Sequence, residues 1–383
     1  IFVATKGVRV DGHQFIPVVF AKGAMAVICE VLPKEDLGPC ILVKDSFMAL
    51  KQAAAFYRQQ LNIRVVGITG SVGKTSTKEF VASVLSEKYK VHKTAGNYNN
   101  EVGLPLTIFG IQEDDQIAVL EMGINTFGEM HRLSEVAKPD ICVMTNIGQC
   151  HLENLIDRDG ILRAKSEIFD FMNPKGTVVV NGDDDKLATI HEVYGKAPVT
   201  FGMNKQNAIW ADHIENRGLL GSCADIHMGD DVVHAIIPLP GEHMIYNAMA
   251  AAAVALQFGM SKEEIAAGIS HVEAVAGRSH LVEAGDKVII DDCYNANPVS
   301  MKAAIDLLAT APGRKVAILG DMFELGENEK AMHGEVGEYA AEKGIDLILC
   351  VGELSEAMYQ EAVGSGGNAK YYETREALEA VLR

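Results

Sequence analysis

The stretch Gly67-Ile-Thr-Gly70-Ser-Val-Gly73-Lys74-Thr75 decides how the rest of the chain is interpreted. It follows a run of Val and Ile residues and precedes an amphipathic helical pattern, which is the setting of a phosphate-binding loop. Glycines let backbone N–H groups converge on phosphate oxygens, and the dipole of the following helix favours negative charge. The loop therefore predicts a nucleoside triphosphate site made by Gly70, Ser71, Val72, Gly73, Lys74, Thr75 and Ser76.

Within this loop, Lys74 is the expected contact of the β- and γ-phosphates, and the Thr75 hydroxyl is the expected Mg²⁺ ligand. One position departs from the usual pattern, because Ile68 stands where a glycine is common, five residues before Gly73. A glycine-rich turn before an ordinary helix is the alternative. A GTPase is disfavoured, because no guanine-reading Asn-Lys-x-Asp string is present.

Apolar runs alternate with helical patterns along most of the chain. Runs rich in Val and Ile are typical of parallel strands covered on both faces, and they lie at 63–69, 117–122, 141–146, 177–181, 288–292, 315–319 and 347–351. Helical patterns include 47–61 and 74–89. We predict an α/β protein of three domains, with a β-rich excursion at about 196–238.

The predicted domains are a small, incomplete N-terminal α/β domain over 1–61, a central domain over 62–277 and a C-terminal domain over 278–383. The central domain would hold the phosphate loop in a doubly wound, mostly parallel sheet. The C-terminal domain would be Rossmann-like and is also expected to be incomplete.

The amino-acid composition excludes further classes of protein. The 383 residues carry 34 Lys and Arg against 52 Asp and Glu, a net charge of −18 that argues against nucleic-acid binding. The 7 cysteines form no CxxC pair, which indicates reduced thiols. The sequence contains no run of about 18 apolar residues, so it predicts no membrane span. We expect a cytoplasmic protein and a monomer.

Three further residues are candidates for chemistry. Glu121 closes an apolar strand, where a Mg²⁺-directing carboxylate belongs beside a phosphate loop. His151 follows another such strand, and Lys165 lies in a helical pattern 14 positions later. Taken alone, each has a structural alternative: a solvated strand end, a packing histidine and a surface lysine.

Together these residues lie in motifs that resemble those of the ATP-dependent Mur ligases of peptidoglycan synthesis. The motifs occur in the family's order over nearly the whole chain, at 70–75, 97–105, 121–123, 128–129, 146–153, 164–168, 241–247, 277–278, 291–300 and 320–326. The strings Asp-Asp-Cys-Tyr-Asn-Ala-Asn-Pro and Gly-Asp-Met-Phe-Glu-Leu-Gly resemble those of the family member that adds D-alanyl-D-alanine.

The resemblance implies ATP and two Mg²⁺ ions as cofactors. Thr75 and Glu121 would bind one ion, and His151 with a carbamylated Lys165 would bind the other. The implied catalytic residues are Lys74, Glu121, His151 and Lys165. The implied nucleotide contacts beyond the loop are Asn247, Arg278, Asp292 and Tyr294, and the implied substrate contacts are Asn99, Asn100 and Asn295.

The implied reaction joins two small-molecule substrates, UDP-N-acetylmuramoyl-tripeptide and D-alanyl-D-alanine, through an acyl phosphate, with closure of 278–383 onto the centre. Two alternatives stay open: another Mur-type or folylpolyglutamate-type ligase, and a truncated nucleotide-binding module without activity. The chain begins at Ile1 without Met, and we expect a first strand and a uridine-binding motif before it and a final strand after Arg383.

Overall fold

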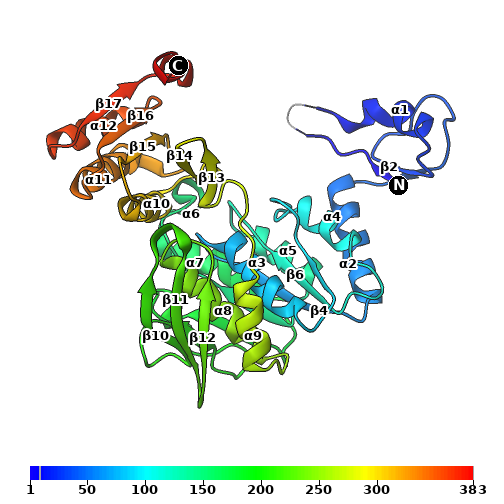
Figure 1. Ribbon diagram of the computed structural model, residues 1–383. Coiled ribbons are helices and arrows are strands. Elements are labelled where there is room, and N and C mark those ends of the chain that lie inside the picture. Colours follow the sequence, from blue (N-terminus) through cyan, green and yellow to red (C-terminus); the bar gives the residue numbers. More distant parts are fainter. Residues whose placement is uncertain (8–9, 383) are drawn as a thin grey trace.

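The computed structural model describes residues 1–7 and 10–382, which form three successive blocks of helices and strands (Figure 1). The first block is dark blue, the central block runs from light blue through cyan and green to yellow, and the last block runs from dark yellow through orange to red. None of the described residues belongs to a helix long and apolar enough to cross a membrane. The α/β fold with one large, mostly parallel sheet is confirmed; the domain limits at 61/62 and 277/278 stay a prediction.

The central block is built on a nine-stranded sheet of order β12-β11-β10-β9-β8-β7-β4-β6-β5. Its strands are β4 (Arg64–Thr69), β5 (Val91–Lys93), β6 (Ile117–Glu121), β7 (Ile141–Met144), β8 (Thr177–Asn181), β9 (Val199–Gly202), β10 (Ile209–Asn216), β11 (Ser222–Met228) and β12 (Asp231–Ile237). Pairing is parallel from β5 through β10 and antiparallel from β10 to β12.

The β-rich segment at 196–238 corrects one expectation, because it is no excursion from the central sheet. Strand β9 pairs with β8, and β10 pairs with β9, so the segment extends the same sheet at one edge. Turns follow β10 at Gly218 and β11 at Gly229, and both glycines have a positive φ. These turns allow the chain to double back in antiparallel strands, which short connections favour.

Helices cover both faces of this sheet. One face packs against α3 (Lys74–Ser86), α8 (His243–Leu256) and α9 (Lys262–Ser270), and the other against α2 (Ser46–Gln60), α4 (Gly103–Phe109), α5 (Glu129–Ala137) and α7 (Arg158–Ser166). Successive strand residues enter opposite cores, as Val65 and Val66 show. Burial on both faces explains why the central strands β6 and β7 consist almost entirely of apolar residues.

The first block is small. A parallel sheet of β1 (Phe2–Val3), β2 (Val27–Cys29) and β3 (Cys40–Leu42) packs with α1 (Ile16–Ala21), and α2 follows it. Helix α2 begins where the Asp45 side chain accepts a hydrogen bond of 2.8 Å from the Met48 N–H. This capping interaction satisfies one of the free N–H groups of the first turn.

The last block holds a parallel sheet of order β15-β16-β17 with helices around it. Its elements are α10 (Pro298–Thr310), β15 (Val316–Gly320), α11 (Glu329–Glu342), β16 (Leu347–Val351), α12 (Ser355–Gly364), β17 (Ala369–Tyr372) and α13 (Arg375–Leu382). Alternation of strand and helix produces this parallel order, as the sequence predicts.

The expected parallel strand at 288–292 is wrong in its pairing. It is β14 (Lys287–Asp291), which forms an antiparallel hairpin with β13 (His280–Ala284). Gly285 has a φ of +67° in the two-residue turn Gly285-Asp286, which fits a tight hairpin. Ile289 is 51 % exposed, so an apolar run here marks a two-stranded ribbon rather than a covered sheet.

Candidate active site

The phosphate loop runs from the end of β4 to the start of α3, as its sequence predicts. Gly70 has a φ of +147°, and a Cβ there would lie 2.0 Å from the Thr145 hydroxyl oxygen. Gly73 has a φ of +83° directly before α3. Both glycines are therefore required by the backbone. Ile68, the position that departs from the usual pattern, is a fully buried residue of β4, so the loop begins after it.

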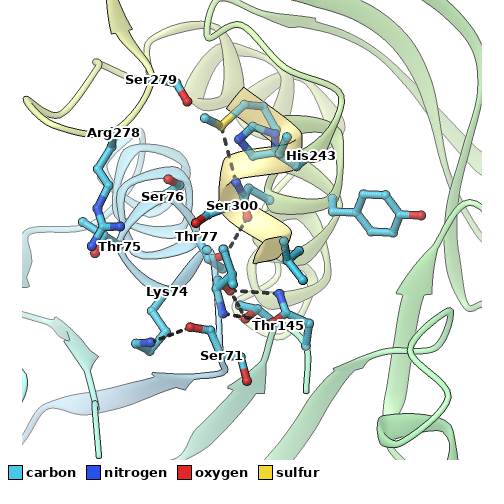
Figure 2. A pocket seen from close by; sticks show the side chains of 18 of the residues that line it. Ser71, Lys74, Thr75, Ser76, Thr77, Thr145, His243, Arg278, Ser279 and Ser300 are labelled. Atoms are coloured by element: carbon cyan, nitrogen blue, oxygen red, sulfur yellow. Dashed lines mark hydrogen bonds between the residues drawn. The ribbon is translucent and has the colours of Figure 1, made fainter. Parts of the chain in front are cut away.

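Lys74 folds back over this loop (Figure 2). Its Nζ donates hydrogen bonds to the carbonyl oxygens of Gly70 at 2.8 Å and Ser71 at 3.2 Å. Burial lowers the pKa of Lys74; nearby Glu121 acts in the opposite direction, and Arg278 adds to the lowering. Two cations, Lys74 and Arg278, thus face the same space, which favours an anionic ligand.

The loop after β7 holds the phosphate loop in place. Asn146 accepts a hydrogen bond of 3.0 Å from the Val72 N–H and donates one of 2.9 Å to the Val72 carbonyl. The Thr145 hydroxyl donates to the same carbonyl at 2.6 Å. Our site prediction did not include Thr145 or Asn146, although their position directly after an apolar strand is visible in the sequence.

A cavity of about 240 Å³ opens above the loop, between the central and last blocks. The predicted residues that line it are Ser71, Val72, Gly73, Lys74, Thr75, Ser76, Asn247, Arg278, Asp292 and Asn295. The sequence prediction missed other lining residues, among them Thr77, His243, Tyr246, Ser279, Asn297 and Ser300. Asn297-Pro-x-Ser300 carried a readable signal, because Asn297 and Ser300 form the capping box of α10.

Asn247 reaches the cavity from α8. It lies in the second turn of the helix, which begins at His243, so it does not cap the helix. Its Oδ1 accepts a hydrogen bond of 2.7 Å from the buried Thr77 hydroxyl on α3. Two helices that cover the same sheet face are therefore joined beside the loop.

The last block supplies one wall of the cavity. The Arg278 guanidinium lies 4.1 Å from the centre of the Tyr294 ring, a cation–π contact. Asp292 accepts a hydrogen bond of 3.0 Å from the Ser279 N–H, and burial raises its pKa. Tyr294 is half exposed and, within the described chain, is not among the lining residues; it supports Arg278 instead.

A second group of predicted residues lies beside the loop. Glu121 ends β6 with a 1 % exposed side chain, and its Oε2 has no hydrogen-bond partner among the described residues. Lys165 on α7 is fully buried, and its Nζ likewise has no partner in the described chain. Burial lowers the pKa of Lys165 to about 8, and the charge of Lys74 acts in the same direction.

His151 belongs to this group through its electrostatics. Burial lowers its pKa, and the charges of Lys165 and Lys74 add to that effect. It has a φ of +53° directly before α6 (Leu152–Leu155), and its Nδ1 contacts a carboxylate oxygen of Glu324 in the last block. The structure therefore brings Lys74, Glu121, His151 and Lys165 together.

The neighbouring residues Asn99 and Asn100 differ in their contacts. Asn99 donates a hydrogen bond of 2.7 Å from Nδ2 to Oε1 of Glu121. Asn100 accepts hydrogen bonds from the N–H groups of Val102 and Gly103 at the start of α4. Asn100 thus has a structural role in the turn before α4, whereas Asn99 orients a predicted metal ligand.

Comparison with known proteins gives the family. Two family models match: the Mur ligase middle domain over residues 68–255 and the Mur ligase, glutamate ligase domain over residues 277–383. The UDP-N-acetylmuramoyl-tripeptide–D-alanyl-D-alanine ligase of Bacillus subtilis is 37 % identical over 398 residues, which cover 100 % of this chain and 84 % of that protein. The Escherichia coli enzyme of the same name is 37 % identical over 94 % of this chain and 79 % of its own.

Solved structures agree. The crystal structure of MurF from Acinetobacter baumannii superposes with a TM-score of 0.91 at 34 % identity, covering 99 % of this chain and 83 % of that one. MurF from Thermotoga maritima in complex with ADP gives 0.83 at 29 % identity, covering 99 % and 92 %. Folylpolyglutamate synthase of Mycobacterium tuberculosis shares only the fold, at 16 % identity and a TM-score of 0.70, covering 88 % and 87 %. Because relatives above 30 % identity match along most of their length, the chain belongs to the Mur ligase family.

Proposed function

We propose that this chain is an ATP-dependent ligase that joins D-alanyl-D-alanine to UDP-N-acetylmuramoyl-tripeptide and so forms the pentapeptide precursor of peptidoglycan. The observation that carries the proposal is the pair of buried, unpartnered groups, Glu121 Oε2 and Lys165 Nζ, beside a phosphate loop. Curated relatives that match nearly all of the chain carry this activity in their name.

In this proposal, different residues bind different parts of the nucleotide. The N–H groups of 70–76 and the amine of Lys74 bind the ATP phosphates, while Asn247 and Arg278 bind the rest of the nucleotide. A carboxylate of the tripeptide substrate attacks the γ-phosphorus, and ADP leaves. The amine of D-alanyl-D-alanine then attacks the acyl phosphate, and phosphate leaves. Positioning and charge neutralisation by Lys74 lower both barriers.

The residues present also fit two Mg²⁺ ions. Glu121 offers a carboxylate oxygen without a partner, and Thr75 offers a hydroxyl at the start of α3, both oxygen ligands of the kind Mg²⁺ takes. His151 and Lys165 would hold the second ion. When bound, Mg²⁺ neutralises the charge between the γ-phosphate and the substrate carboxylate.

We further propose that Lys165 is carbamylated. A pKa of about 8 leaves a substantial share of its amine neutral near physiological pH, and a neutral amine adds to CO₂. The ammonium first gives up one proton; the neutral amine then forms an N–C bond with CO₂ and loses a second proton, so that an unpartnered buried cation becomes a carbamate anion. An unmodified lysine there would repel a metal ion.

The remaining predictions are proposals of the same kind. We place the domain limits at 61/62 and 277/278, and we place the tripeptide and dipeptide substrates near Asn99 and Asn295. Asn100 we now assign to the turn before α4. We also propose a cytoplasmic monomer whose last block closes over the nucleotide, since the cavity is lined from two blocks.

The test is phosphate release from ATP by the purified chain with UDP-N-acetylmuramoyl-tripeptide, with and without D-alanyl-D-alanine, at saturating Mg²⁺ and bicarbonate. We expect that phosphate release requires both substrates. We also expect that the pentapeptide nucleotide is formed. Lys74→Ala abolishes it, and Lys262→Ala, at an exposed lysine of α9, leaves it unchanged. ATP binding without any ligation would favour the nucleotide-binding module, and ligation only with glutamate or a diamino acid would favour another ligase of the family.

A further inference from the structure

The outer face of the antiparallel strands β10–β12 carries a cluster of carboxylates and imidazoles far along the sheet from the phosphate loop. Side chains alternate between the two faces of a strand. Ala211, Ala224, Ile226, Val233 and Ala235 face the core. The opposite, solvent-facing positions are therefore occupied by Trp210, Asp212, Asp225, His227 and His234.

Two aspartates lie directly opposite one another on this face. Asp212 of β10 pairs in register with Asp225 of β11. Each side chain is only about a quarter exposed. Like charges directly across a strand pair are destabilising, so a cation between or beside the carboxylates stabilises this arrangement.

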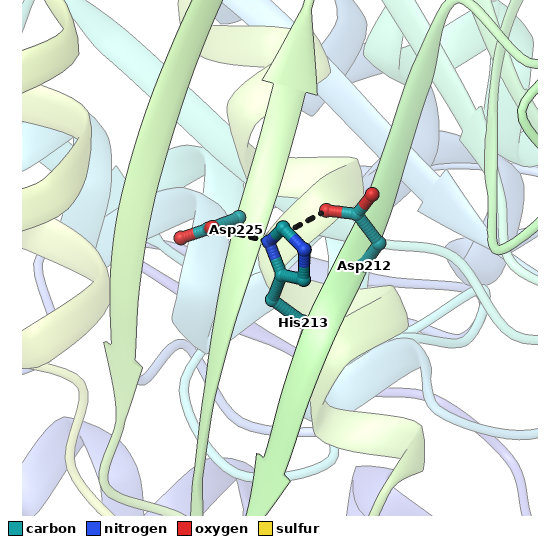
Figure 3. Close-up of side chains that lie close together, drawn as sticks. All are labelled: Asp212, His213 and Asp225. Carbon is teal, nitrogen blue, oxygen red and sulfur yellow. Dashed lines mark hydrogen bonds and ion pairs between the residues drawn. The ribbon is translucent and has the colours of Figure 1, made fainter.

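His213 lies between these two carboxylates (Figure 3). A register shift between Asp212 and Glu215 marks a bulge, and the bulge keeps His213 on the outer face with its neighbour. The His213 Nδ1 lies 2.9 Å from Oδ2 of Asp225 and 3.5 Å from Oδ1 of Asp212. One ligand atom from each of the three residues lies within 4.8 Å of the others.

The two distances from His213 Nδ1 are compatible with a small divalent ion. Zn²⁺ binds nitrogen and carboxylate oxygen at about 2.0–2.2 Å, which puts the ligand atoms of a tetrahedral site about 3.3 Å apart. The distances from His213 Nδ1 to the two carboxylates, 2.9 and 3.5 Å, lie on either side of that value. An imidazole in the set favours Zn²⁺ over Mg²⁺, which prefers oxygen ligands alone.

Two further histidines hold the carboxylates. The Nε2 of His227 lies 2.7 Å from Oδ1 of Asp212, and the Nδ1 of His234 lies 2.8 Å from Oδ1 of Asp225. Metal-binding carboxylates are commonly fixed by such outer hydrogen bonds. Lys205 also approaches, with Nζ 3.3 Å from Oδ2 of Asp212.

From this geometry we infer that Asp212, His213 and Asp225 form a Zn²⁺-binding site that joins β10 to β11 near the edge of the central sheet. The site is separate from the phosphate-loop cavity and does not depend on the proposed function. Solvent supplies the fourth ligand, because His213 is exposed. The ion replaces the proton that otherwise lies between Nδ1 and the two carboxylates.

The chain carries its own reporter for this site. Trp210 is the single tryptophan, and its ring stacks on His227 with 3.6 Å between ring centroids and 2° between planes. Because His227 contacts Asp212, a metal ion on Asp212 changes the surroundings of the indole. Zn²⁺ is titrated into the whole chain at neutral pH with excess Mg²⁺, and Trp210 emission is followed together with competition by a chromogenic zinc chelator.

We expect a saturable change in emission with one equivalent of Zn²⁺ and a higher thermal unfolding midpoint in its presence. His213→Ala and Asp225→Asn weaken binding more than tenfold. His271→Ala is the matched control, because this exposed histidine pairs with one carboxylate, Glu87, and it keeps wild-type binding.

Both substitutions are on a solvent-facing surface, and unchanged circular dichroism of the variants separates lost binding from lost folding. An emission change that follows pH but not Zn²⁺ would show that protonated histidines alone neutralise Asp212 and Asp225. Equal zinc affinity of Asp225→Asn and the wild type would also overturn the assignment.

Discussion

Asn99 donates a hydrogen bond of 2.7 Å from its side-chain amide to Oε1 of Glu121, while Oε2 of that buried carboxylate has no hydrogen-bond partner among the described residues and is free to bind a metal ion. Groups that orient a metal ligand in this way typically contribute 10–100-fold to metal affinity. We predict that Asn99→Ala raises the Mg²⁺ concentration for half-maximal ligation by about 10–100-fold. Activity measured against Mg²⁺ concentration checks this.

Asn100 provides the matched comparison, because it is adjacent and its side-chain oxygen accepts hydrogen bonds from the backbone. Its Oδ1 holds the first N–H groups of α4, so Asn100→Ala lowers the free energy of unfolding by about 1 kcal/mol. The Mg²⁺ requirement of that variant stays at the wild-type value. If both variants changed the Mg²⁺ requirement equally, a general loosening of 97–103 would explain the effect.

The contact between Thr77 and Asn247 predicts a coupled loss of stability and nucleotide affinity. Thr77→Val keeps the shape of the side chain but leaves the buried Oδ1 of Asn247 without its donor. Such an unsatisfied group costs about 1–3 kcal/mol of unfolding free energy. We also expect a higher KM for ATP, because Asn247 lines the cavity.

Urea unfolding and ATP kinetics of Thr77→Val measure the two effects. Thr77→Ser retains the hydroxyl and is expected to keep most of both properties. A Thr77→Val variant with reduced stability and an unchanged KM for ATP would argue against Asn247 as a nucleotide contact.

Lys165 predicts an unusual dependence of stability on pH. Its pKa is about 8 in the folded chain, below the ordinary lysine value, so between these two values the unfolded chain binds more protons than the folded chain. The free energy of unfolding therefore rises with pH across this window, by up to roughly 3 kcal/mol when Lys165 is unmodified. Below the window both states are protonated and the burial penalty is complete.

Urea unfolding of the wild type and Lys165→Met at the two ends of this window, in buffer free of CO₂, measures the effect. The wild type is expected to gain more stability with pH than the variant. Added bicarbonate reduces the difference, because a carbamylated nitrogen no longer takes up the proton. If the free energy of unfolding of the wild type changed with pH as that of Lys165→Met does, both with and without bicarbonate, the low pKa and the carbamylation of Lys165 would both be contradicted.

Local patterns were sufficient to predict the elements and the phosphate loop, but not the pairings between distant segments. The glycines at 70 and 73 mark the loop because only glycine fits their backbone and space. Runs of Val and Ile mark strands, but the run alone at 288–292 does not show how it pairs; the Gly285-Asp286 turn before it is the local signal of the hairpin that the prediction missed. Thr77 and Asn247 meet across 170 positions, and His151 and Glu324 across 173. Such contacts depend on how whole helices and blocks pack, and the local periodicity of apolar residues carries no information about that packing.

The contact between His151 and Glu324 leads to the last prediction. It joins the central block to the loop after β15, where Glu324 itself has a φ of +61°. A carboxylate that accepts the proton of Nδ1 leaves the lone pair of Nε2 available for a metal ion and fixes the ring orientation. Glu324 is thus expected to act as a positioning residue for His151 as well as a link between blocks.

We predict that Glu324→Ala raises the Mg²⁺ requirement of ligation by about 10–100-fold, whereas Glu324→Gln, which keeps an acceptor oxygen, has a smaller effect. Glu327→Ala, at an exposed carboxylate three residues later, serves as the control with wild-type behaviour. The readouts are activity against Mg²⁺ concentration and the susceptibility of the last block to proteolysis. If Glu324→Ala increases proteolysis but keeps the wild-type Mg²⁺ requirement, the contact tethers the two blocks and does not orient His151. In that case the imidazole keeps its metal-binding orientation without Glu324, and only the link between the blocks is lost.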